Sequence, residues 1–82
     1  MATDQIKDEI RKYILENIVQ DDSKELKYDT LLISSGVIDS ISTLKMVSFL
    51  ESRFGFEFNP HEVDRENLDS IDLIADFVAS KI

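Results

Sequence analysis

The sequence is poor in the two residue types, cysteine and histidine, that most often perform nucleophilic and metal chemistry. The chain contains no cysteine, and His61 is its single histidine. Disulfides, thiolate metal sites and histidine clusters are therefore largely excluded, and we predict no metal site. One serine of interest is Ser40, which directly follows Asp39 at a predicted junction between a loop and a helix. Because no general base is evident near Ser40, we interpret it as a hydroxyl to be modified and predict no catalytic residue.

The position of Ser40 suits an attached anion. A phosphodiester on its oxygen would lie beside the amide groups and the positive dipole end of the helix that begins there. Gly36, four residues earlier, can adopt backbone angles denied to other residues, although it can equally be an ordinary turn residue. An Asp-Ser pair before a helix is by itself more often a simple cap, and capping and attachment are compatible.

Size and composition favour one small domain without catalysis. We expect the 82 residues to form a single domain over 1–82. Its stability should be on the order of 4–8 kcal/mol, which leaves little room for a deep catalytic cleft. We therefore expect a protein that is not an enzyme.

The charge balance points to protein partners. Seventeen acidic residues against nine basic ones give a net charge of −8, which opposes nucleic-acid binding and favours basic protein surfaces. No apolar run approaches the roughly 18 residues that a membrane span needs, and no basic segment followed by an apolar stretch opens the chain. We expect a cytoplasmic monomer.

The first half of the chain predicts one helix followed by a long loop. Apolar residues at spacings of three and four predict a helix from Thr3 or Asp4 to Val19. The stripe consists of Ile6, Ile10, Tyr13, Ile14 and Ile18. From Gln20 to about Asp39 the periodicity lapses, with polar residues at 21–23 and 34–36. This loop still holds too many apolar residues for a solvated linker, so we expect it to pack over a helical bundle and to be functional.

The second half predicts three further helices. A second helix should run from Asp39 or Ser40 to about Phe54, where Gly55 stops it. Its predicted inner face consists of Ile41, Leu44, Val47, Leu50 and Phe54. Asn59-Pro60 then predicts the start of a short helix of only one or two turns, because the run 64–67 is polar throughout. The last helix should begin near Asp69 or Ser70.

The expected fold class is all-α. It is a four-helix bundle with three longer helices, one short third helix and a long packed loop between the first two helices. The last helix should direct Ile71, Ile74, Ala75, Phe77 and Val78 towards the core.

Gly36, the Asp39-Ser40 pair and the stretches that follow them resemble the acyl carrier protein family. In that family an Asp-Ser pair after a glycine opens the second helix, and the resemblance continues through 50–62, 66–71 and 74–78. It therefore spans nearly the whole chain.

The resemblance implies that Ser40 carries a covalently attached 4'-phosphopantetheine. A phosphopantetheinyl transferase would attach it from coenzyme A with magnesium, and Asp39 would contribute to transferase recognition or to the metal contact in that complex. The arm would supply the thiol that the chain lacks and hold acyl groups as thioesters. The implied partners are that transferase, an acyl- or aminoacyl-activating ligase, and a downstream acyltransferase or synthase.

The same analogy implies that part of an acyl chain is held between the helices, whereas ordinary core is the favoured interpretation of each residue concerned. Those residues are Leu44, Val47, Leu50, Ile71 and Ile74.

The tripeptide 69–71 repeats the Asp-Ser-Ile of 39–41 and is a decoy for the attachment site. Glu66 stands at the position that corresponds to a glycine, and Ser70 directly precedes the apolar pattern of the last helix. We therefore interpret Ser70 as a helix cap.

Two features depart from the carriers of fatty-acid synthesis. Two residues, Val37 and Ile38, separate the glycine from the Asp-Ser pair where those carriers typically have one, and the second helix has no net charge. These features favour a specialised carrier, such as a D-alanine carrier or one served by a stand-alone adenylating ligase. Its partner-reading positions would be Ser42, Thr43, Lys45 and Met46. The alternatives are a housekeeping fatty-acid carrier and a helical interaction module without a prosthetic group.

Overall fold

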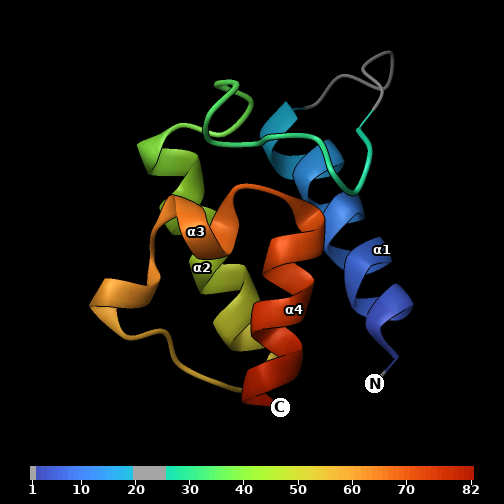
Figure 1. Cartoon of the computed structure of the whole chain (residues 1–82), viewed down its shortest axis with the longest axis vertical. Helices are drawn as coiled ribbons and strands as arrows, with labels where there is room; N and C mark the ends of the chain where they lie inside the picture. Colours follow the sequence, from blue (N-terminus) through green and yellow to red (C-terminus); the bar gives the residue numbers. More distant parts are fainter. Residues whose placement is uncertain (1, 20–25) are drawn as a thin grey trace.

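The computed structural model describes residues 2–19 and 26–82, and these form helices joined by loops (Figure 1). Helix α1 spans Thr3–Ile14 and continues as a π-helical turn over Leu15–Val19. The polar residues 21–23, which we expect in the loop, lie outside the described residues. The other long helices are α2 (Ser40–Phe54) and α4 (Ile71–Lys81).

The all-α prediction is confirmed, since no strand occurs within residues 2–19 and 26–82. Helix α4 packs against α1, and Figure 1 shows α4 between α1 and α2 in this view. One apolar core is shared by all three long helices and by the loop before α2. Its members are Ile6, Ile10, Ile14, Leu26, Leu32, Ile38, Met46, Val47, Leu50, Leu68, Ile71, Ile74, Ala75 and Val78.

The loop between α1 and α2 is part of this core, as predicted. Leu26, Leu32 and Ile38 are buried, so residues of the loop contribute at three separate points along its length. Burying side chains of this size stabilises a domain by about 1.5–3 kcal/mol each. The end of the loop that leads into α2 is therefore held against the bundle by hydrophobic packing.

The predicted inner face of α2 is correct for Val47 and Leu50 and wrong for Ile41 and Leu44. Ile41 is 68% exposed and Leu44 is 63% exposed. A helix turns by about 100° per residue, so a repeated spacing of three drifts by about 60° at each step. Ile41 consequently lies about 180° around the helix from Leu50. Met46, which we expected near the surface, completes the buried stripe at 0% exposure.

The short third helix is divided into two pieces. Pro60–Glu62 form one 3₁₀ turn, and the Asn59 amide donates to the Glu62 carboxylate at 2.8 Å. The polar run 64–67, which we expected only to limit the short helix to one or two turns, opens a second helical piece, α3 (Arg65–Leu68). The Asp64 carboxylate accepts from the Asn67 amide, and Leu68 is fully buried at the other end. A cap and one apolar anchor therefore suffice for a helical turn where the periodicity gave no signal.

Both predicted boundaries that rest on local chemistry are confirmed. Gly55 ends α2 in the left-handed conformation with φ 73°, where a glycine is favoured. Ser70 caps α4, because its hydroxyl accepts from the Leu73 amide at 3.1 Å. No helix among the described residues is long and apolar enough to cross a membrane.

Candidate functional site

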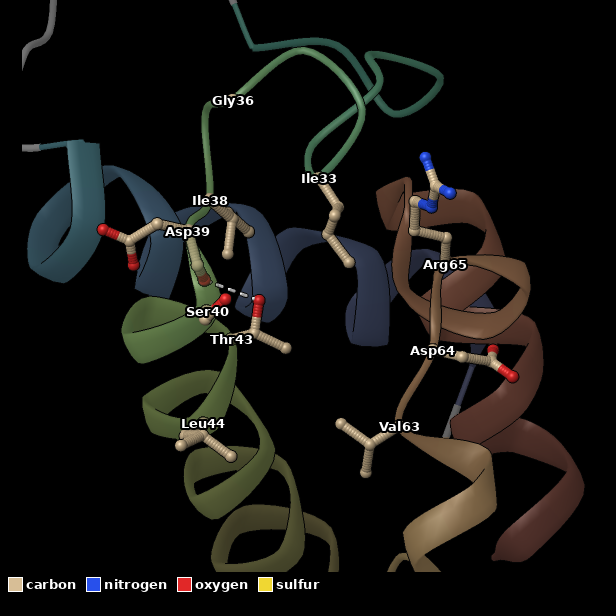
Figure 2. A pocket seen from close by; sticks show the side chains of 10 residues that line it. All are labelled: Ile33, Gly36, Ile38, Asp39, Ser40, Thr43, Leu44, Val63, Asp64 and Arg65. Carbon is tan, nitrogen blue, oxygen red and sulfur yellow. Dashed lines mark hydrogen bonds between the residues drawn. The ribbon is translucent and has the colours of Figure 1, made fainter.

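Ser40 is the first residue of α2 and its side chain is exposed. The preceding Asp39 is the helix cap: its carboxylate accepts from the Ser42 amide at 2.7 Å, and its carbonyl accepts from the Thr43 hydroxyl at 2.8 Å. Figure 2 shows the Asp39 carboxylate pointing away from the groove that Ser40 borders. The two predicted site residues are therefore adjacent but face different surroundings.

Asp39 is held in its ionised form by the start of the helix. Its hydrogen bond from the Ser42 amide lowers the pKa of the carboxyl, and the positive charge of Lys45 acts in the same direction. The Ser42 amide is thus already occupied by a carboxylate. A phosphodiester on Ser40 could therefore interact with the helix dipole but could not accept a hydrogen bond from the Ser42 amide. The helix start offers an anion one amide fewer than the sequence suggested.

A groove of about 590 Å³ opens beside Ser40. Its walls come from the loop before α2, from the first turns of α2 and from the segment that leads into α3. Figure 2 shows Leu44 and Val63 on opposite sides of this space and Ile33 pointing into it from the loop. The lining residues are Ile33, Gly36, Ile38, Asp39, Ser40, Thr43, Leu44, Val63, Asp64 and Arg65.

Of the five residues considered for an acyl-lining role, only Leu44 borders this groove. Val47, Leu50, Ile71 and Ile74 are core residues, which was the favoured interpretation. Leu44 is exposed, so its interpretation as core was wrong.

Gly36 shapes the loop that forms one wall of the groove. Its φ is 82°, a left-handed conformation that residues with a Cβ rarely adopt, and open space surrounds the position where a Cβ would be. The requirement for glycine is therefore conformational and not steric. The loop then closes on itself, because the Ile38 amide donates to the Leu32 carbonyl at 2.9 Å immediately before Asp39.

Asp69 was missed as a site residue. It is buried at the junction of α3 and α4, and its carboxylate accepts from the amides of Ile33 and Ser34 at 2.8 and 2.9 Å. The Ser34 hydroxyl donates to the second carboxylate oxygen at 2.6 Å. These hydrogen bonds, that of the Ser34 hydroxyl first, lower the pKa of Asp69. From the sequence, Asp69 was considered only as a possible helix start and as part of the tripeptide 69–71.

The two Asp-Ser-Ile tripeptides, 39–41 and 69–71, differ in the burial of their serine. Ser70 is 6% exposed and its hydroxyl is engaged in capping α4, whereas Ser40 is exposed beside the groove. A modifying enzyme can reach Ser40 without unfolding the chain. Ser70 is not accessible in this way.

The predicted partner-reading positions are only partly at the surface. Lys45 is exposed and Ser42 and Thr43 are half-buried, but Met46 belongs to the core and is withdrawn from that set. The sequence missed that the apolar side chains of Ile41 and Leu44 project from the same part of α2. Beyond Asp39, the exposed surface of the first turns of α2 is therefore largely apolar, with Lys45 as its charged residue.

Within residues 2–19 and 26–82, no group of three or more histidine and acidic side chains is arranged to hold a metal ion. No family model matches the chain. A stretch of 43 residues, 52% of this chain, is 44% identical to "Acyl carrier protein 2, mitochondrial" of Arabidopsis thaliana. That stretch spans 32% of the relative's length. The match supports a relation to the acyl carrier protein family, and it does not distinguish subtypes within the family.

The residues around Ser40 fit the prosthetic group that this family implies. The hydroxyl is exposed for attachment, and the largely apolar groove beside it can receive part of an attached arm or its cargo.

Proposed function

We propose that the chain is an acyl carrier protein that holds an acyl or aminoacyl group on a phosphopantetheine arm attached to Ser40. The observation that carries the proposal is an exposed serine hydroxyl at the first position of α2, beside a groove, in a chain with partial identity to an acyl carrier. The arm supplies a terminal thiol for thioester formation. The protein supplies an accessible hydroxyl, a capped helix and surfaces for its partners.

A catalytic role for Ser40 has no support in its surroundings. His61 is exposed on the 3₁₀ turn and does not line the groove, and the neighbouring Asp39 is engaged with the Ser42 amide. An activated nucleophile needs a base within hydrogen-bonding reach. Ser40 is accordingly the acceptor in a transfer reaction that a separate phosphopantetheinyl transferase carries out.

The test is intact mass after incubation with a phosphopantetheinyl transferase, coenzyme A and magnesium. The parent should gain one phosphopantetheine, Ser40→Ala should gain none while remaining folded, and Ser70→Ala should still be modified. No gain by the parent would favour an interaction module in which Asp39 and Ser40 only start a helix. Modification of Ser40→Ala would place the attachment site elsewhere.

We further propose that the carrier serves a specialised pathway in which a ligase adenylates the cargo before transfer to the thiol. The surface of α2 near Ser40 supports this proposal, because its exposed residues are Ile41, Leu44 and Lys45 and none is acidic. A basic patch that reads an acidic helix would find only the cap Asp39 as a complementary charge at this end of α2.

Loading of the holo protein separates this proposal from a housekeeping fatty-acid carrier. A stand-alone acyl or aminoacyl ligase should load the holo protein more efficiently than enzymes of the fatty-acid cycle do. The comparison is made at low and raised salt, because the net charge of −8 can attract basic surfaces over long range. Malonyl loading and elongation as efficient as with the enzymes' own carrier would favour the housekeeping role and leave Ser40 as the attachment site.

A further inference from the structure

We propose that Asp69 is a positioning residue for Ser40: its buried carboxylate fixes the loop that forms one wall of the groove and leads into α2. This inference rests on the proposed function, since it concerns how the hydroxyl of Ser40 is presented to a modifying enzyme. Asp69 does not line the groove and would not touch the arm.

The side chain of Asp69 makes several hydrogen bonds to one short segment of the loop. Oδ1 of Asp69 accepts from the amides of Ile33 and Ser34, and Oδ2 accepts from the Ser34 hydroxyl. The Asp69 carbonyl also accepts from the Leu32 amide at 2.7 Å. Three consecutive loop residues are thus bonded to the junction of α3 and α4. Hydrogen bonds to a buried carboxylate are among the stronger ones in proteins.

Loop residues 32–34 are connected to Ser40 through Ile38. Ile33 is itself a wall of the groove, and the Leu32 carbonyl accepts from the Ile38 amide at 2.9 Å. Ile38 is buried and is followed directly by Asp39 and Ser40. The position of the helix start is therefore set from two directions, by the packing of Ile38 and by the loop that Asp69 holds.

Two substitutions of Asp69 differ in how many of these hydrogen bonds they can keep. Asp69→Ala leaves two amides and a hydroxyl without their acceptor. Asp69→Asn can keep the two amide bonds through its carbonyl oxygen and can donate from its amide to the Ser34 oxygen, which is able to accept. Positioning should therefore be lost in the alanine variant and largely kept in the asparagine variant. Asp76→Ala removes a carboxylate from the exposed face of α4 and is the matched control.

The experiment measures kcat/KM for transfer of phosphopantetheine to the apo protein, at a temperature where each variant is fully folded by circular dichroism. For Asp69→Ala we expect a fall of about ten- to a hundredfold, the scale that small misplacements of a reacting group produce. Asp69→Asn and Asp76→Ala should stay within about threefold of the parent. Ser34→Ala, which loses the hydroxyl bond alone, should fall by about two- to tenfold.

Amide hydrogen exchange is the second readout, and a merely global loss of stability would not reproduce its expected pattern. In Asp69→Ala, exchange should accelerate at residues 32–40 while the amides of α1 and the second half of α4 keep their protection. Uniform acceleration would overturn the proposal. So would modification at the parental rate.

The positioning role of Asp69 can still be tested if Asp69→Ala does not fold. Ser34→Ala then carries the test, with Ser52→Ala on the exposed side of α2 as its control. A rate and a loop protection equal to those of the parent would overturn the positioning role. Failure of the proposed function is distinguishable, because the parent itself would then gain no phosphopantetheine.

Discussion

The Ser34 hydroxyl donates to the Asp69 carboxylate at 2.6 Å although 35 residues separate the two in the chain. This bond connects the loop before the candidate attachment site to the junction of the last two helices. The other helices therefore do more than pack against the buried face of α2. They also fix the loop that decides where α2 begins.

The stability of the domain should fall in acid partly through Asp69. Its folded-state pKa is lowered by hydrogen bonds from Ser34, so its contribution is full above the unfolded pKa of about 3.9. As the pH falls through the folded pKa, the carboxylate is protonated and the contribution is lost.

Urea denaturation at pH 7 and at about pH 3 checks this expectation. The midpoint of Asp69→Asn should lie below that of the parent at pH 7, and the gap should narrow at the lower pH. Asp76→Asn controls for the loss of one negative charge. A gap that is the same at both pH values would contradict the role of the ionised carboxylate.

Truncating Leu50 should destabilise the domain far more than truncating Leu44. Leu50 is fully buried, so Leu50→Ala removes transfer energy and leaves a cavity, at a cost of about 2–5 kcal/mol. Leu44 is 63% exposed, and Leu44→Ala should change stability by about 0.5 kcal/mol or less. Thermal or urea unfolding of both variants measures the difference. Similar losses would show that the exposed face of α2 is misplaced.

Ser70→Ala should lower stability by about 0.5–2 kcal/mol, because the Leu73 amide loses its capping acceptor at the start of α4. Chemical denaturation measures this loss. Ser70→Thr, which retains a capping oxygen, is the control and should lose less. A variant Ser70→Ala as stable as the parent would mean that the cap contributes nothing to folding.

Replacing Gly55 should be unfavourable for a conformational reason. Its φ of 73° is left-handed, and open space surrounds the position that a Cβ would occupy. Gly55→Ala should therefore cost about 1–2 kcal/mol from backbone strain alone. Gly55→Asn should cost less, because asparagine tolerates this region better. Equal unfolding midpoints for the two variants would contradict that explanation.

Much of this protein follows from local sequence. The stripe Ile6, Ile10 and Ile14, the stop at Gly55 and the cap at Ser70 were all predictable, because each depends on residues within about one helical turn. The loop-to-helix junction at Ser40 was predictable for the same reason. The comparison with a known acyl carrier supports the family to which these local features pointed.

Tertiary structure decided which way the side chains face and which distant residue supports the site. The sequence offered Ile41 and Leu44 as core because they are apolar and evenly spaced, but only the neighbouring helices determine which side of α2 is covered. Nothing in the local sequence of Asp69 indicates that its carboxylate accepts from the amides of Ile33 and Ser34, because only the folded chain brings these residues together. Helix starts and stops depend on neighbours along the chain, whereas burial and long-range hydrogen bonds depend on neighbours in space.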